Sequence, residues 1–189
     1  MLWISSSSWF VICLLTAFIH QTYVWLSWRA ELNHKWWTRR FKKRGLVYHA
    51  TIFFVLISLR PLTIIFLSIS DMGSISMPRW VYWSGLVLMT VLSGYTIYSI
   101  VRYFDLIRAT GADHFDDKYK KMPFVSRGMF KYTPNAMYTF ALLALWIPGW
   151  LLNSKLGIIA GVLHHAFVWV HYFCLEKPDI NKIYGGNKR

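Results

Sequence analysis

Acidic residues are scarce in this chain: its 189 residues include 8 Asp and Glu against 21 Lys and Arg, a formal net charge of +13. Charged residues of both signs make up only 15% of the sequence, whereas soluble domains carry roughly 25%. A nucleic-acid-binding protein would explain the positive charge but has no use for long apolar runs. An excess of Lys and Arg on one membrane face explains both features, so we expect a membrane partner and no nucleic acid.

Cysteine and the common catalytic motifs are nearly absent as well. Cys13 and Cys174 lie in apolar runs and form no CxxC pair, which argues against a disulfide framework or a zinc site. His164, His165 and His171 share one apolar run, but no further ligand follows at a metal-binding spacing, so we favour core or interfacial histidines over a metal site. The sequence has no HExxH, GxSxG, Walker-type loop or GxGxxG, so any group transfer does not use a Rossmann nucleotide site.

Long apolar runs dominate what remains, and about 20 apolar residues suffice to cross a membrane as a helix. The runs cover about Leu2 to Trp28, Leu46 to Ser70, about Trp80 to Phe104, and Met137 to Leu175. The last is too long for one span and is broken near Asn153, which predicts a helical hairpin. We therefore expect an all-α, polytopic membrane helix bundle with about five segments. The fourth, Met137–Leu152, is short and contains Pro148 and Gly149, so it crosses fully, tilts strongly or is re-entrant.

Basic residues alternate along the connections and predict the orientation. The connections 29–45, 71–79, 105–136, 153–155 and 176–189 hold seven, one, six, one and four Lys or Arg. The positive-inside rule then places the N-terminus outside and the C-terminus in the cytosol, in a bacterial inner membrane or the endoplasmic reticulum. No basic residue precedes Arg29, so the first run lacks the basic start of a signal peptide. Tryptophans among the charges of the first connection favour an interfacial segment over a nucleic-acid site.

Six of the eight acidic residues follow the third apolar run, on the inferred cytosolic side. Asp116 and Asp117 neighbour three lysines, so we interpret them as a solvated face that pairs with Lys. Asp113 lies in a partly apolar stretch after a glycine, and Glu176 directly follows an apolar run. A carboxylate at that depth needs a positive partner, from the protein or from a cationic ligand. Arg60 lies mid-span before a proline, where it is either functional or pairs with a carbonyl that the proline frees.

Two separated motifs resemble those of a known family. The stretch from Gly128 to Tyr138 is similar to the motif Gly-x-Tyr/Phe-x-x-x-Arg-His/Asn-Pro-x-Tyr of integral-membrane methyltransferases. The stretch from Glu176 to Gly185 resembles their second motif, Glu-Glu-x-x-Leu-x-x-x-Phe/Tyr-Gly, after an intervening hairpin. The superfamily includes isoprenylcysteine carboxyl and phospholipid N-methyltransferases, and the residues fit the phosphatidylethanolamine N-methyltransferase-like branch. The resemblance divides the chain into a three-span region, 1–104, and a methyltransferase-like region, 105–189.

The resemblance implies an S-adenosylmethionine-dependent methyltransferase with a cytosolic cofactor site and a lipid-like acceptor, most readily a phospholipid amine. The residues it implies for cofactor binding are Gly128, Asn135, Tyr138 and Glu176. Glu176 would receive the ammonium group of the cofactor. The candidate substrate-binding residues, for a carboxylate or a lipid phosphate, are Arg127 and Lys131. The candidates for taking the proton of an amine acceptor are Asp113 and His114. In-line methyl transfer needs alignment and no metal.

Two alternatives stay open at this point. The acceptor is alternatively a prenylated cysteine carboxylate or another small lipophilic thiol or acid; a carboxylate needs no general base. A protein of another class, a non-catalytic lipid-binding or accessory subunit, is favoured by Pro134, Ala136 and Lys177, which depart from the family motifs. For a membrane reductase that uses a nicotinamide cofactor, the sequence offers no residues to hold the cofactor phosphates.

Overall fold

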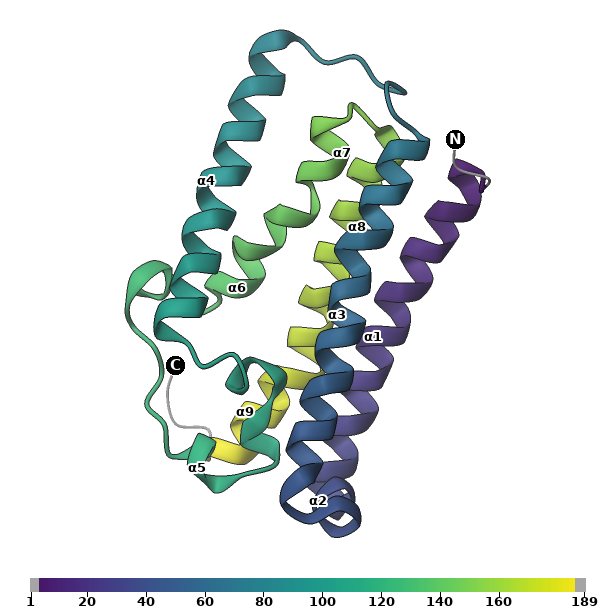
Figure 1. The fold of residues 1–189 in the computed structure, drawn as a ribbon. Helices are drawn as coiled ribbons and strands as arrows, with labels where there is room; N and C mark the ends of the chain where they lie inside the picture. The colour runs from purple at the N-terminus through teal and green to yellow at the C-terminus, as the bar shows by residue number, and fades with distance from the viewer. Residues whose placement is uncertain (1–3, 186–189) are drawn as a thin grey trace.

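Helices account for the architecture of this protein, which a computed structural model describes over residues 4–185 (Figure 1). The α-helices are α1 (Ser6–His34), α2 (Trp36–Phe41), α3 (Gly45–Ser70), α4 (Arg79–Tyr103), α5 (Asp117–Lys120), α6 (Ala136–Thr139), α7 (Ile147–Leu151), α8 (Lys155–His171) and α9 (Lys177–Tyr184). Short 3₁₀-helices cover Lys42–Arg44, Arg108–Thr110, Ala112–His114, Gly128–Lys131 and Ala141–Leu145, and a π-helix covers Tyr172–Glu176. The first residues of the predicted run from Leu2 lie outside the described part.

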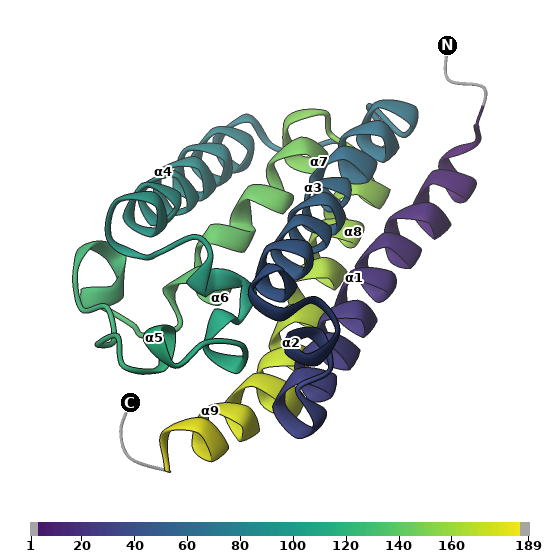
Figure 2. The same cartoon turned by 60° about the horizontal axis from the view of Figure 1, so that its bottom comes forward.

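Within residues 4–185, four helical stretches are long and apolar enough to cross a membrane: Ser6–His34, Trp36–Ser70, Arg79–Tyr103 and Lys155–Tyr184. A shorter apolar stretch, Ala136–Leu151, accompanies them. Helices α1, α3 and α8 lie side by side, α4 stands apart on the other side, and α6 and α7 lie between α4 and α8 (Figure 1, Figure 2). The predicted polytopic membrane helix bundle is confirmed.

The predicted hairpin near residue 153 is confirmed, and glycines allow its two arms to touch. Ser154 caps the start of α8, where its hydroxyl accepts a hydrogen bond from the backbone N–H of Gly157 at 2.9 Å. A Cβ on Gly157 would lie 2.8 Å from the Cα of Gly149. A Cβ on Gly161 would lie 2.8 Å from the carbonyl oxygen of Leu145. The GxxxG spacing on α8 thus permits the close backbone approach typical of membrane helices.

The short stretch Ala136–Leu151 reaches the far end of the bundle. There the backbone N–H of Gly73, in the loop between α3 and α4, donates to the carbonyl of Leu152 at 3.0 Å. Part of the stretch, Ala141–Leu145, is a 3₁₀-helix. Such a helix rises about 2.0 Å per residue instead of about 1.5 Å, so the whole stretch covers about 26 Å. That length approaches the thickness of the bilayer core, roughly 30 Å.

The first basic connection, expected as an interfacial segment outside the spans, is mostly helical. Helix α1 continues past Trp28 because the next residues include no glycine or proline, and it ends where Lys35 takes a left-handed φ of 53°. The fully buried Glu31 accepts hydrogen bonds from the backbone N–H groups of Trp37 and Thr38 and from the hydroxyl of Thr38. One carboxylate therefore caps α2 and fixes the corner between α1 and α2.

The C-terminal tail continues the last helix through the π-helix into α9. Helix α9 lies against the end of α1, where Arg29 Nη1 is 3.0 Å from Asp179 Oδ1 and Lys182 Nζ donates to Asn33 Oδ1 at 2.8 Å. We call this end of the bundle, formed by residues 29–45, 104–136 and 176–185, the basic end. It lies opposite the end at which α1 begins (Figure 1).

Candidate functional site

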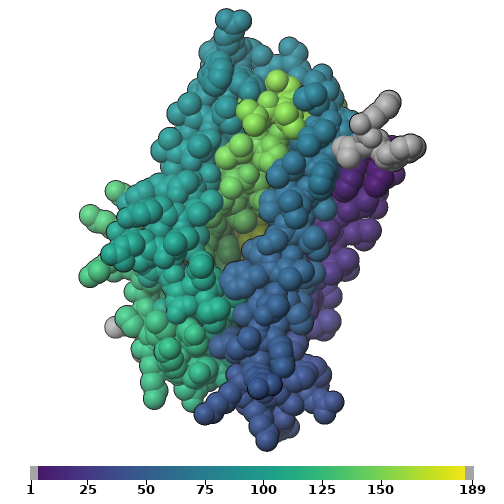
Figure 3. Space-filling model, in the orientation of Figure 1, coloured from purple at the N-terminus to yellow at the C-terminus, as the bar shows by residue number. Residues whose placement is uncertain are grey.

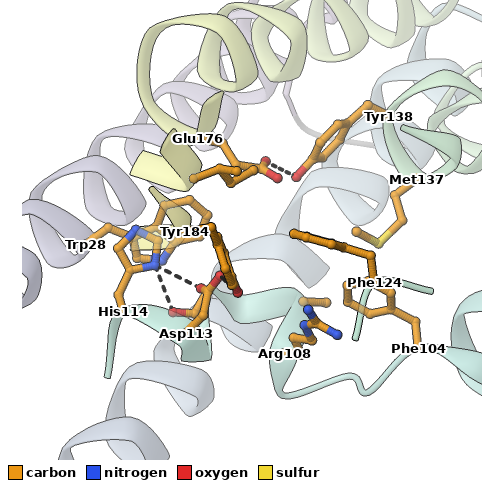
Figure 4. Close-up of a pocket in the computed structure, with 13 residues that line it drawn as sticks. Trp28, Phe104, Arg108, Asp113, His114, Phe124, Met137, Tyr138, Glu176 and Tyr184 are labelled. Atoms are coloured by element: carbon orange, nitrogen blue, oxygen red, sulfur yellow. Dashed lines mark hydrogen bonds and ion pairs between the residues drawn. The ribbon is translucent and has the colours of Figure 1, made fainter. Parts of the chain in front are cut away.

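A polar cavity of about 60 Å³ lies at the basic end, between α1, the connection after α4, α6 and α9 (Figure 4). Four of its lining residues bear groups that can be charged: Arg108, Asp113, His114 and Glu176. Aromatic rings supply much of the remaining wall. The cavity therefore combines both signs of charge with flat apolar surfaces at one end of a membrane bundle.

The two sequence motifs meet in this cavity. The hydroxyl of Tyr138 donates a hydrogen bond to the carboxylate of Glu176 (Figure 4). Tyr138 lies in α6, and Glu176 is the last residue of the π-helix that joins α8 to α9. Single π-helical turns are frequent at functional sites, where they reorient one side chain within a continuous helix. Residues 38 positions apart thus form one wall of the polar cavity.

A network of charged groups forms another part of the wall. His114 Nδ1 lies 3.1 Å from Asp113 Oδ1, and its Nε2 lies 3.2 Å from Oδ2 of the fully buried Asp179. The hydroxyl of Tyr184 donates to Asp113 Oδ2 at 3.0 Å. Burial by itself lowers the pKa of His114, but hydrogen bonds to the two carboxylates and their charges outweigh it and raise that pKa to about 9. The imidazole is therefore protonated at neutral pH and ties α9 to the connection after α4.

Asp113 stays ionised because it lies beside the protonated His114. Burial raises the pKa of this carboxyl, but the hydrogen bond and the charge of His114 outweigh burial and hold the pKa below its usual value. The polar cavity thus carries a negative charge at Asp113 whose hydrogen-bond partners hold its orientation.

The indole ring of Trp28 covers this network of charged groups and accounts for the glycine at position 111. Its ring stacks on His114 with the centroids 4.5 Å apart, and its Nε1–H donates to the carbonyl of Thr110 at 2.9 Å. Directly beneath, Gly111 takes a left-handed φ of 82°. A Cβ there would lie 2.2 Å from Cε2 of Trp28. Both the backbone conformation and the space under the indole therefore require glycine.

Arg108 supplies a fixed positive charge to the cavity. Its Nη1 donates to the carbonyl of Pro123 at 2.8 Å and its Nη2 to that of Met122 at 3.1 Å. The guanidinium carbon lies 5.7 Å from the ring centroids of both Phe104 and Phe124, within cation–π range. These contacts hold the guanidinium in place, so it can meet an anionic group without first being ordered.

A second, larger cavity of about 250 Å³ adjoins the first inside the bundle. The two share Trp28, Ala109, Met137 and Tyr138 as walls. Most of the lining of the larger cavity is apolar and comes from α1, α3, α8 and the Ala136–Leu151 stretch, with Ile100 of α4 also in the lining. Tyr138 therefore stands between a polar cavity at the basic end and an apolar one among the spans.

The structure brings only some of the predicted site residues together. Asp113, His114, Tyr138 and Glu176 line the polar cavity. The other four predicted residues do not line it: Gly128, Asn135, Arg127 and Lys131. Arg127 and Lys131 are exposed at the surface of the basic end.

Gly128 and Asn135 shape the backbone next to the polar cavity. Gly128 has a left-handed φ of 60°, and a Cβ on it would lie 2.5 Å from Oγ of Ser99, so it allows the connection to lie against α4. The carbonyl of Asn135 accepts from the backbone N–H and the hydroxyl of Thr139, and from the N–H of Tyr138, in the first turn of α6. Both residues therefore help to place Tyr138 without lining the cavity.

Sequence reasoning missed Trp28, Arg108 and Tyr184 as parts of the site. The sequence alone places Trp28 at the end of the first apolar run, Arg108 among the basic residues that indicate orientation, and Tyr184 within the second motif. The one available signal was Gly111, since a glycine before Asp113 indicates that a bulky neighbour passes close to the backbone.

The described residues thus form an all-α membrane bundle in which a polar cavity and an apolar cavity share one wall. The chain matches the profile of a family described as Phospholipid methyltransferase over residues 80–187, more than half of its length. The protein therefore belongs to the phospholipid methyltransferase family. No curated protein and no solved structure matches the chain significantly. The match begins at α4, so the predicted division between residues 104 and 105 stays a prediction.

Proposed function

We propose that this protein transfers a methyl group from S-adenosylmethionine to a lipid-like acceptor, with a phospholipid amine as the favoured acceptor. The observation that carries the proposal is the hydrogen bond between Tyr138 and Glu176 at the wall shared by the two cavities. Membership of a methyltransferase family supports the methyl donor. A water-soluble donor on one side of Tyr138 and a lipid on the other would meet at that wall.

The residues of the polar cavity fit such a donor. Glu176 is the carboxylate for an ammonium group, through a charge-assisted hydrogen bond. Arg108 is placed to meet a carboxylate, and Phe104 and Phe124 line the cavity beside it as apolar walls for an adenine. A cavity of about 60 Å³ is small for a nucleoside. We infer that the Tyr138 hydroxyl leaves Glu176 when a ligand enters.

The bound donor supplies an electrophilic methyl group. The remaining tasks fall to the chain: aligning the acceptor, excluding water and removing a proton from an ammonium acceptor before it attacks. We assign the proton to Asp113, which lines the polar cavity and is ionised. His114 already carries its proton at neutral pH, since its pKa is raised to about 9, so we assign it the role of holding Asp113 in place.

The apolar cavity is the proposed acceptor site. Figure 3 shows a hollow between α3 and α4 in which the deeper, green Ala136–Leu151 stretch is visible. Ile57 of α3 and Ile100 of α4 both line the cavity, so it adjoins this gap. A lipid could therefore reach Tyr138 sideways from the bilayer.

We infer from the positive-inside rule that the basic end is cytosolic and that α1 begins outside. A cysteine placed at Asp116 in an otherwise cysteine-free chain should react with an impermeant maleimide only from the cytosolic side. Labelling from the outside would reverse this orientation.

Transfer of a radiolabelled methyl group tests the function. The purified protein is reconstituted in vesicles with S-adenosylmethionine and, in separate arms, phosphatidylethanolamine, a prenylated cysteine, or a neutral lipid. We expect label in phosphatidylethanolamine, at least tenfold less in Glu176→Gln, and no change in Asp117→Asn, an exposed acid of the basic end that pairs with Lys120. Label in the prenylated cysteine would select the alternative acceptor. Donor binding without label in any arm would favour a non-catalytic lipid-binding subunit.

A further inference from the structure

The deep part of the apolar cavity contains charge and polarity that the proposed methyl transfer does not use. Arg60, His20 and His171 line it together with mostly apolar side chains. By the rise of about 1.5 Å per residue, Arg60 lies about 22 Å along α3 from its start at the basic end. That depth is within the hydrocarbon region, where ionisable residues are expensive and mark substrate pathways or pair with an opposite charge.

Arg60 has no acidic partner in the described chain. It is 2% exposed, and its Nε and Nη2 donate to Nδ1 and the carbonyl of His164 at 3.2 and 2.8 Å. The carbonyl that Arg60 binds therefore belongs to α8. It is not a carbonyl of α3 left without a donor by Pro61. The four ion pairs found within residues 4–185 all lie at the basic end and exclude Arg60. The described lining of the apolar cavity includes no Asp or Glu.

His20 is the second observation, independent of Arg60. Its side chain is almost fully buried, with 3% of the residue exposed, and neither ring nitrogen has a hydrogen-bond partner among the described residues. An unpaired buried polar group costs roughly 1–3 kcal/mol, so a histidine that only filled space would be expected to find a partner. His20 instead lines the cavity that also contains Arg60 and His171.

We propose that His20 and Arg60 form a binding site, within the membrane-embedded cavity, for an anionic oxygen group of the acceptor lipid, with His171 completing its polar lining. A phosphate or a carboxylate would supply the missing counter-charge of Arg60 and accept a hydrogen bond from His20. The apolar side chains that make up most of the cavity lining would surround the hydrocarbon chains of the same lipid. The inference rests on the proposed function for naming the ligand as methyl acceptor, whereas the anion site itself does not depend on it.

Native mass spectrometry of the detergent-purified protein, titrated with three probes of equal chain length, tests the site. The probes are hexadecyl phosphate, palmitate and hexadecanol. We expect at least one anionic probe to bind about tenfold more tightly than hexadecanol, since a hydrogen bond to a charged group contributes on the order of 1.5–3 kcal/mol. Tighter phosphate binding would assign a lipid phosphate, and tighter carboxylate binding a lipophilic acid. Equal affinity for all three probes would overturn the proposal.

His20→Leu is the decisive variant, because His20 has no hydrogen bond to a described residue to lose and leucine can keep its apolar contact with the ring of Phe53. We expect about a tenfold loss of affinity for the anionic probe. The matched control is His34→Leu, the same change at an exposed position of the same helix, which should bind like the wild type. Arg60→Lys should retain part of the affinity and Arg60→Gln should lose it. Wild-type affinity in His20→Leu would remove His20 from the site.

A separate measurement distinguishes this proposal from the proposed function. Binding of S-adenosylmethionine should be unchanged in His20→Leu, because His20 does not line the polar cavity. A wild-type protein that binds S-adenosylmethionine but shows no preference for the anionic probes would sink the anion site alone. Absence of donor binding in the wild type would sink the proposed function and leave the anion site to be judged by the three probes.

Discussion

Raising the pH through about 9 should loosen α9 from the rest of the basic end, because the contact depends on a proton on His114. That imidazolium lies between Asp113 and Asp179, and its pKa is raised from 6.5 to about 9 in the folded protein. A group with a raised pKa contributes stability that is fully present below the unfolded value, near pH 6.5. The contribution falls as pH rises and is lost above about 9.

The structure sets the size of this effect. At about 1.4 kcal/mol per pKa unit, the shift of His114 corresponds to roughly 3 kcal/mol of stability. Removing the imidazole at neutral pH should cost a similar amount or more, roughly 3–5 kcal/mol, because the buried carboxylate of Asp179 loses one of its two positive partners. In a chain of this size such a loss lowers the unfolding temperature by roughly 6–20 °C.

Thermal unfolding in detergent between pH 6 and 10 measures the contribution of the His114 proton to stability. The wild type should lose stability across this interval, and His114→Gln should start lower at pH 6 and show a much flatter profile. The matched control, His34→Gln, changes an exposed histidine and should follow the wild type. The wild type and His114→Gln share every other titrating group, so the difference between their profiles reports His114. A wild-type slope in His114→Gln would refute the assigned proton.

Two further predictions concern glycines and use matched controls measured by the same unfolding assay. Gly111→Ala should destabilise the protein by at least 3 kcal/mol, since a Cβ there meets the indole at 2.2 Å, whereas Gly73→Ala, also left-handed but with nothing within 4 Å, should cost only about 1 kcal/mol of backbone strain. Equal costs would mean that the indole yields freely. Gly161→Ala should separate α8 from the Ala136–Leu151 segment and destabilise, whereas Gly94→Ala, in open space on α4, should stabilise by up to about 1 kcal/mol. A stabilising Gly161→Ala would contradict the close backbone contact.

The spans could be predicted from sequence because hydropathy is a local property. Helices α3 and α4 begin and end within about one residue of the predicted runs 46–70 and 80–104. The end of α1 could not be predicted in the same way. Its last turns are charged, and they are ordered by a tertiary contact in which Glu31 caps α2. A side chain that accepts hydrogen bonds from the backbone of another helix leaves no hydrophobic periodicity in its own segment.

The candidate site divides along the same line. Tyr138 and Glu176 belong to motifs whose order and spacing are visible in the sequence, so their proximity could be expected. Arg108 and Trp28 come from a connection and from the first span, and only the packed bundle brings them to the cavity. The unpartnered nitrogens of His20 were equally beyond sequence reasoning, because a missing hydrogen bond is visible only when all neighbours are placed.

The central claim is that the polar cavity beside Tyr138 and Glu176 binds the methyl donor. Isothermal titration calorimetry of the purified protein with S-adenosylmethionine and with its demethylated product tests this claim most directly. The account predicts binding of both, at least tenfold weaker in Glu176→Gln and unchanged in Asp117→Asn, since Asp117 lies outside the cavity. Wild-type affinity in Glu176→Gln, or no binding by the wild type, would contradict it.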